Sequence, residues 1–191
     1  GEGFFLAALR KPEEDGEADT DLFSPKKKKS KGDTAASPVS KENLAIAKSW
    51  LASSDEYNLL VNGTAITAFP VYYQNDLALL LQSLRIVQAG TEVAEVKGKD
   101  LIPAHGLAMS RLLKTSVFST EALTYEQAIA YLRKEAIVLP PSVPKGYVLV
   151  TYKEIPLGFV KNIGNRANNL YPQEWRIRSG YLPETVVKVH S

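Results

Sequence analysis

"YVLVTYKEIPLGFVKNI" (residues 147–163) contains two runs of β-branched and aromatic side chains, separated by a short Lys-Glu-Ile-Pro turn. Such runs are typical of β-strands, so the stretch predicts strands over 147–153 and 157–163. Further short strands are expected at 136–140, 174–179 and 185–190, with prolines and turn residues between them. This pattern favours a small β-barrel or half-barrel late in the chain.

The preceding region mixes helical and strand patterns. Ser40 is placed to cap a helix that runs through Leu51. Asn62-Gly63 lies between two β-type runs and predicts a hairpin with a type I′ turn. Helical patterns recur at 75–84, 104–113 and 124–133, and the first of these is apolar enough to predict a buried helix. Two strands, with turns at Gly90 and Gly98, are expected over 85–103. The whole chain is therefore predicted to be α+β.

The first 41 residues differ in composition from the rest. Residues 11–41 contain few large apolar side chains, so they cannot offset an ordering entropy of ~1–2 kcal/mol per residue and are predicted to be a disordered linker. Within it, Lys26–Lys29 is interpreted either as a solvated part of the linker or as an electrostatic tether for nucleic acid. Residues 2–10 form an apolar run of strand length with no partner strand nearby.

Several classes of function are excluded by composition. The 191 residues include no cysteine and two histidines, so a thiolate metal site, a disulfide and a cysteine nucleophile are all ruled out for this chain. No apolar run approaches the ~20 residues of a membrane span, and no secretory signal is recognisable, which predicts no membrane partner and a cytoplasmic location. Phosphate-loop, dinucleotide-fold and serine-hydrolase motifs are also missing. The chain alone is not expected to be an enzyme.

The net charge of +2 conceals a basic segment late in the chain. Residues 142–191 contain seven basic and three acidic side chains, and aromatic and amide side chains alternate with the basic ones. Basic groups neutralise phosphates, aromatic rings stack on unpaired bases, and amides bind base edges. The predicted RNA-binding residues are Lys145, Lys153, Lys161, Asn162, Asn165, Arg166, Asn168, Asn169, Arg176 and Arg178. The alternative is that the asparagines are turn formers and the basic residues are merely exposed.

Four stretches resemble one protein family. They are "EGFFLAALRK" (2–11), "LIPAHGLAM" (101–109), "YEQAIAYLRKEAI" (125–137) and "GYVLVTYKEIPLGFVKNIGNRANNLYPQEWRIR" (146–178). Together they are similar to the end of bacterial members of the Nol/Nop/Sun family of RNA cytosine-C5 methyltransferases. The resemblance implies a remnant of the last methyltransferase strand at 1–10, the linker at 11–41, an intermediate α+β domain at 42–118 and a PUA-like RNA-binding β-barrel at 119–191.

The resemblance also implies what lies elsewhere in such a protein. A methyltransferase domain upstream would bind S-adenosylmethionine and supply two catalytic cysteines; no catalytic, cofactor-binding or metal-binding residue is carried over to this chain. The implied function is to dock ribosomal RNA, of the 16S type, for methylation by that domain, with the protein acting as a monomer. A second class of function is left open, in which the region packs on its own catalytic domain without contacting RNA.

Overall fold

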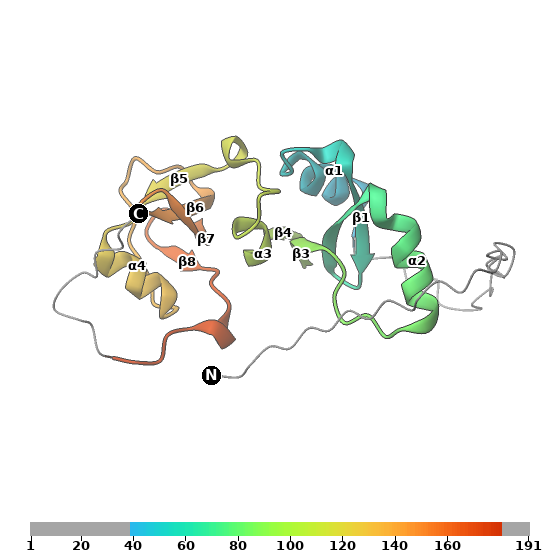
Figure 1. Cartoon of the computed structure of the whole chain (residues 1–191). Helices are drawn as coiled ribbons and strands as arrows, with labels where there is room; N and C mark the ends of the chain where they lie inside the picture. The colour runs from blue at the N-terminus through green and yellow to red at the C-terminus, as the bar shows by residue number, and fades with distance from the viewer. Residues whose placement is uncertain (1–38, 181–191) are drawn as a thin grey trace, which may run out of the picture. The chain divides into compact units, whose positions relative to one another are not determined.

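The structure, a computed structural model, describes residues 39–180. The described part contains two four-stranded sheets and four α-helices (Figure 1). The predicted α+β class is confirmed, and the expected small barrel corresponds to the second of the two sheets. The predicted strands at 1–10 and 185–190, Lys26–Lys29 and nearly all of the predicted linker lie outside the described residues.

The first sheet is antiparallel throughout, with the strand order β1-β2-β3-β4. Its elements in chain order are α1 (Lys41–Ser49), β1 (Tyr57–Asn62), β2 (Ala65–Pro70), α2 (Gln74–Ser83), β3 (Thr91–Lys97), β4 (Asp100–Pro103) and α3 (His105–Ala108), with short 3₁₀ turns at Ser54–Glu56 and Val71–Tyr73. The Ser40 hydroxyl accepts a hydrogen bond from the Asn43 amide at 3.1 Å, which confirms the predicted start of α1.

The second sheet has the order β5-β6-β7-β8, in which only the β5–β6 pair is parallel. Its elements are the 3₁₀ turn Thr115–Val117, β5 (Ser119–Ala122), α4 (Tyr125–Leu132), β6 (Gly146–Tyr152), β7 (Ile155–Asn162), β8 (Ala167–Asn169) and the 3₁₀ turn Gln173–Trp175. Thr124 and Gln127 form the predicted capping box at the start of α4. The first sheet ends at Pro103 and the second begins at Ser119; a domain boundary at 118/119 stays a prediction.

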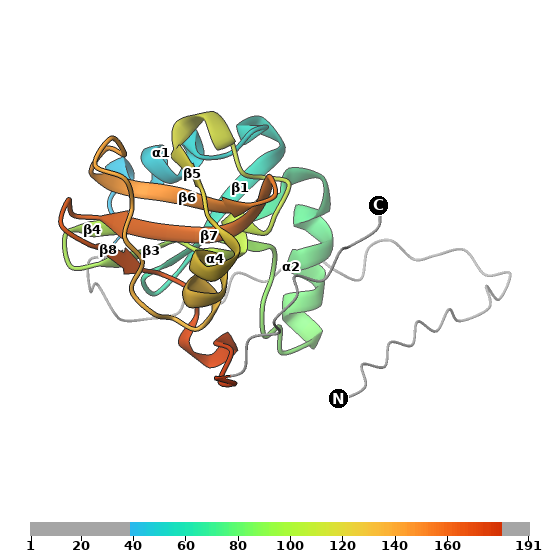
Figure 2. The ribbon, with the colours of Figure 1, turned by 90° about the vertical axis from the view of Figure 1, so that its left-hand side faces the viewer.

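The β6–β7 pair is buried on both faces. Because successive side chains of a strand point to opposite faces, Leu149 and Phe159 enter the hydrophobic cluster that contains Trp50 and the first sheet, whereas Val148 and Val160 enter a second cluster. That second cluster contains residues of α4 (Ala128 and Tyr131 among others). In Figure 2, α4 lies in front of β6 and β7 while α1 and β1 lie behind them. The pair therefore joins the two hydrophobic clusters.

Three local predictions are corrected by the structure. The first is the hairpin turn: Asn62 pairs with Ala65, so the two-residue loop is Gly63-Thr64 and not Asn62-Gly63. Gly63 has a φ of +61°, whereas no described non-glycine residue of this hairpin has a positive φ. A type I′ turn needs positive φ at both central residues, so that turn type was wrong.

The second correction concerns α2, which was predicted to be buried. Of its leucines, Leu77 alone is buried, and Leu79, Leu80 and Leu81 are exposed. Consecutive leucines point around the whole circumference of a helix, and a helix that packs on one neighbour buries only one stripe. Apolar content therefore overstated the burial of this helix.

The third correction concerns 174–179, which was predicted to be a strand. Gln173–Trp175 is a 3₁₀ turn after Pro172, and the following residues pair with no described strand. The outer edge of β8 is already occupied, because Ala167 pairs with Ile137. The Ile177 amide instead donates to the Leu132 carbonyl oxygen at 2.9 Å. Arg176 and Arg178 are consequently not held on one face of a sheet.

Gly158 in β7 offers a direct test of the packing between β7, α4 and α3. Its φ is +141°, and a Cβ there would lie 2.2 Å from the Tyr131 hydroxyl and 2.9 Å from Nδ1 of His105. Gly158→Ala should lower the free energy of unfolding by ~2–5 kcal/mol, because it combines an unfavourable backbone conformation with overpacking. Urea denaturation measures this loss.

Gly63→Ala is the matched control, because Gly63 also has a positive φ but no atom lies within 4 Å of a Cβ placed there. It should lose only the backbone term of ~1–2 kcal/mol. Equal losses for the two variants would show that contact with Tyr131 and His105 does not exclude a side chain at Gly158.

Candidate nucleic-acid interface

The loop between β7 and β8 presents part of the predicted RNA-binding set. Asn165 and Arg166 are exposed in this loop, and the loop is closed by a hydrogen bond from the Ile163 amide to the Arg166 carbonyl oxygen at 3.0 Å. A Cβ placed at Gly164 would lie 2.9 Å from Cε of Lys145, so the stem of the exposed Lys145 crosses the same loop. Lys145, Asn165 and Arg166 form one group, termed here the loop cluster.

Asn162 holds this loop from within. Its side-chain amide is buried and donates to the carbonyl oxygens of Val143 and Pro144 at 3.0 and 3.1 Å. Its Oδ1 accepts a hydrogen bond from the Gly164 amide at 2.9 Å. The Asn162 side chain thus bonds to the backbone that precedes β6 and to the backbone of the β7–β8 loop, so its role is structural.

Asn169 has a comparable position at the other end of β8. Its Nδ2 donates to the carbonyl oxygens of Tyr131 and Glu135 at 2.8 and 2.9 Å, and its Oδ1 accepts from the Tyr171 amide. These bonds attach the end of β8 to the last turn of α4, at Tyr131, and to the residues that follow the helix, at Glu135. Asn168, between the two structural positions, is exposed.

Lys161 is paired rather than free. Its Nζ lies 2.6 Å from a carboxylate oxygen of Asp100 in β4 and 5.6 Å from the ring centroid of Tyr147. The hydrogen bond to Asp100 is the main reason that the pKa of Lys161 is raised. Lys161 therefore links the two sheets across the surface, and much of its charge is offset locally.

The remaining predicted residues lie at two other places. Lys153 is exposed in the β6–β7 turn, the opposite end of β7 from the loop cluster. Arg176 and Arg178 lie beyond the 3₁₀ turn Gln173–Trp175 and, with Arg133, line a hollow of about 300 Å³. These three arginines are termed the arginine cluster. The structure thus distributes the predicted set over separate clusters, and RNA contact by each residue stays a prediction.

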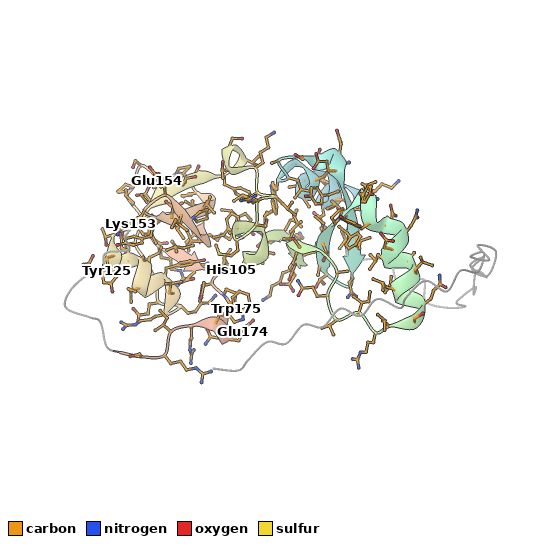
Figure 3. The ribbon with its side chains drawn as sticks, in the orientation of Figure 1. His105, Tyr125, Lys153, Glu154, Glu174 and Trp175 are labelled. Carbon is orange, nitrogen blue, oxygen red and sulfur yellow. The ribbon has the colours of Figure 1, made fainter. Side chains whose placement is uncertain are left out.

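An aromatic group lies beside the arginine cluster, and sequence reasoning missed that His105 belongs to it. The ring of His105 packs edge-on against Tyr171, at a centroid distance of 5.1 Å, and against Trp175, at 5.3 Å (Figure 3). Burial lowers the pKa of His105, which favours the neutral imidazole. Trp175 is 60% exposed. The strand predicted over 174–179 is replaced here by a 3₁₀ turn, for which the preceding Pro172 was the available signal.

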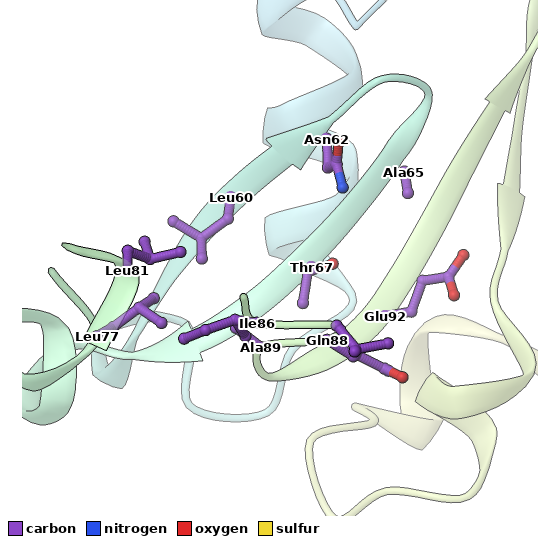
Figure 4. Close-up of a pocket in the computed structure, with 11 residues that line it drawn as sticks. Leu60, Asn62, Ala65, Thr67, Leu77, Leu81, Ile86, Gln88, Ala89 and Glu92 are labelled. Atoms are coloured by element: carbon purple, nitrogen blue, oxygen red, sulfur yellow. The ribbon is translucent and has the colours of Figure 1, made fainter. Parts of the chain in front are cut away.

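The first sheet carries a different, apolar surface. Side chains of β1, β2, α2 and the segment 86–89 line a hollow of about 390 Å³, to which Leu60, Leu77 and Leu81 contribute (Figure 4). Exposed apolar side chains continue around it at Val71, Tyr72, Tyr73, Leu79, Leu80, Leu84 and Val87. This region is termed the α2 face. It carries little charge, since Asp76 is the one charged residue of α2.

Among residues 39–180, no three His, Asp or Glu side chains are grouped so as to hold a metal ion. None of the helices in the same range is long and apolar enough to cross a membrane.

Comparisons with known proteins agree with the resemblance seen in the sequence. A family model described as "Methyltransferase RsmF PUA domain" matches residues 118–177. The chain is 27% identical over 188 residues to ribosomal RNA small subunit methyltransferase F of Shigella boydii serotype 4, which covers 95% of this chain and 36% of the relative. The protein of the same name from Shigella boydii serotype 18 is 29% identical over 186 residues. The one from Shewanella piezotolerans is 27% identical over 180 residues, and the match covers 91% of this chain and 35% of that relative. The chain thus spans about a third of the length of these relatives.

The two kinds of asparagine can be separated by mutation. Asn162→Ala should lower the free energy of unfolding by ~1–3 kcal/mol, because buried carbonyl oxygens and the Gly164 amide lose their partner. Asn165→Ala should change it by less than ~0.5 kcal/mol, because Asn165 is exposed. Chemical denaturation of both variants measures the difference. A stable Asn162→Ala protein would return Asn162 to the set of candidate RNA contacts.

Proposed function

We propose that this chain is the RNA-binding part of a ribosomal RNA methyltransferase, because the model of the methyltransferase RsmF PUA domain matches residues 118–177 and the chain is similar to part of ribosomal RNA small subunit methyltransferase F. In this proposal it docks a ribosomal RNA of the 16S type. A methyltransferase domain of the same polypeptide then transfers a methyl group from S-adenosylmethionine to C5 of a cytosine. The protein acts in the cytoplasm as a monomer.

The observation that carries the proposal is exposed positive charge anchored on the PUA domain. Residues 118–180 contain eight basic and five acidic side chains, whereas residues 39–117 contain seven of each. Lys145, Arg166, Arg176 and Arg178 are exposed. Lys145 directly precedes β6 and Arg166 directly precedes β8, while Arg176 and Arg178 flank Ile177, whose amide donates to the Leu132 carbonyl oxygen at the end of α4. Fixed arginines and lysines neutralise phosphates and position an RNA without reading its sequence.

The polar side chains divide into supporting and contacting groups. Asn162 and Asn169 hold the β7–β8 loop and the end of α4, and Lys161 links the loop region to β4. The proposed RNA contacts are Lys145, Asn165, Arg166, Asn168, Arg176 and Arg178. Lys153 is proposed as a peripheral contact, because it lies in the β6–β7 turn, at the opposite end of β7 from the loop cluster. Because this chain contains no cysteine, the two catalytic cysteines would belong to the methyltransferase domain.

RNA affinity measured at several salt concentrations tests the proposal. Each phosphate contact contributes about −0.7 to the slope of log affinity against log salt for single-stranded RNA. Arg166→Glu combined with Arg176→Glu should weaken binding and make that slope less steep by about 1.4, while the fold is retained because both side chains are exposed. A 16S-type ribosomal RNA fragment is the ligand.

Arg85→Glu combined with Arg111→Glu is the control, because it reverses two exposed arginines outside residues 118–177. It should bind nearly as the parent chain does. Deletion of Lys26–Lys29 should also change little if that run is only linker. If the deletion abolished binding and the Arg166/Arg176 variant bound normally, the lysine run would be the contact and the proposed surface would be wrong.

A second function is favoured by the α2 face. Its exposed leucines and tyrosines form an apolar region larger than scattered surface residues account for, and such regions mark protein interfaces. We propose that this face packs on the methyltransferase domain of the same polypeptide, since the relatives are nearly three times as long as the chain. Docking through the first sheet leaves the PUA domain available to RNA.

Leu81→Ser combined with Leu84→Ser tests this packing. Both side chains are more than half exposed, so the change should lower the stability of this chain by less than ~1 kcal/mol. It should weaken binding to the separately produced upstream domain by more than tenfold, because each leucine buried in an interface contributes ~1.5–3 kcal/mol. Calorimetry measures the affinity. Ile155→Ser, equally exposed on the PUA domain, should leave it unchanged; equal effects of both variants would refute docking through α2.

A further inference from the structure

A further hollow lies between β3, β4 and the segment 170–175, next to the arginine cluster. Its volume is about 470 Å³, within the range of ~300–1,000 Å³ typical of small-ligand sites. It is lined by side chains from the first sheet, from the start of α3, from the residues after α4 and from the segment after β8, among them Glu92, His105, Lys134, Glu174 and Trp175. Figure 3 shows His105, Glu174 and Trp175 gathered at this place. It is termed the Trp175 pocket.

The wall formed by Trp175 is held firmly although its indole is exposed. The Trp175 amide donates to the Pro172 carbonyl oxygen at 3.3 Å, and His105 supports the indole from the side. Lys134 Nζ donates to the carbonyl oxygen of Tyr171, which fixes the start of the same segment to the end of α4. A rigid, accessible indole is a suitable surface for stacking of an unpaired base.

The polar groups of the pocket select the part of a nucleotide that enters. Three glutamates, Glu92, Glu95 and Glu174, line it together with two lysines, Lys97 and Lys134, so the lining has a small negative excess and offers a phosphate less attraction than the arginine cluster does. Carboxylate oxygens accept hydrogen bonds and so favour groups that carry N–H donors. The arginines that would neutralise a phosphate begin at the very next residue, Arg176, outside the pocket. Base and phosphate therefore have separate, adjoining sites.

We propose that the Trp175 pocket binds one unpaired RNA base, stacked on Trp175, while its phosphates lie on the arginine cluster. Guanine is preferred, because its N1–H and N2 amino group present two adjacent donors to one carboxylate. Uracil is disfavoured, because its single N–H lies between two carbonyl oxygens that carboxylates repel. This inference rests on the proposed RNA-binding function and adds to it a base-specific site.

The test uses the full chain and fluorescein-labelled single-stranded octamers, one of uridines only and one with a central guanosine. Fluorescence anisotropy should show at least fivefold tighter binding of the guanosine octamer. Trp175→Ala should reduce that affinity about tenfold and remove the preference. The salt slope should stay unchanged, because stacking releases no counterions; this distinguishes the pocket from the arginine contacts.

Three further variants make the result specific. Tyr72→Ala removes an even more exposed aromatic ring from the α2 face and should leave both affinities unchanged. Trp175→Phe keeps an aromatic ring and should recover part of the lost affinity. Glu174→Gln should lower the ratio of guanosine to uridine binding without weakening the binding of the uridine octamer.

Tryptophan fluorescence gives a separate readout. The chain has two tryptophans, and Trp50 is buried in the first cluster. Quenching by the guanosine octamer should therefore come from Trp175 and disappear in Trp175→Ala. If Trp175→Ala binds like the parent chain while the arginine variants lose binding, the pocket is refuted and the RNA-binding function stands. If the parent chain binds neither octamer nor the ribosomal fragment, both fail.

Discussion

The two-sided burial of the β6–β7 pair is the constraint on which the rest of the structure depends. Leu149 and Phe159 complete the hydrophobic cluster of the first sheet, and Val148 and Val160 form the centre of the second. A strand buried on both faces has no freedom to shift register, since a shift by one residue would exchange the two sets of side chains. The hairpin therefore fixes both halves of the described chain at once.

The same constraint positions the candidate sites. The Tyr131 hydroxyl donates to the carbonyl oxygen of Phe159 at 3.2 Å, which attaches α4 to β7, and Gly158 leaves room for that hydroxyl and for His105. Burial raises the pKa of Tyr131, so the hydroxyl keeps its proton at any physiological pH. His105 in turn supports Trp175. The exposed indole is thus connected to the buried hairpin by a short series of contacts, which explains how a residue after a turn can be held rigidly.

Local signals in the sequence predicted the elements whose formation is itself local. The capping box of Thr124, the cap at Ser40 and the β6–β7 hairpin depend on neighbouring residues, and the structure contains all three. The exposure of α2 and the loss of a strand at 174–179 depend on what packs from elsewhere, so composition could not show them. The asparagines illustrate the same limit. By sequence, the four asparagines of the predicted set are either RNA contacts or turn formers, and only the fold shows that Asn162 and Asn169 bond to distant backbone groups.

The separation between supporting and exposed polar groups also bears on how such a surface could recognise RNA. A single continuous basic strand face would bind phosphates at regular spacing and would read little sequence. Here the loop cluster and the arginine cluster lie on different elements, and the Trp175 pocket, which is lined by an aromatic ring and several carboxylates, adjoins the arginine cluster. In the proposed function, separated charge would fix the orientation of a folded RNA, because only RNAs with phosphates at matching positions would engage both clusters. The carboxylates of the pocket would add selectivity, since they favour a base edge with N–H donors over a phosphate.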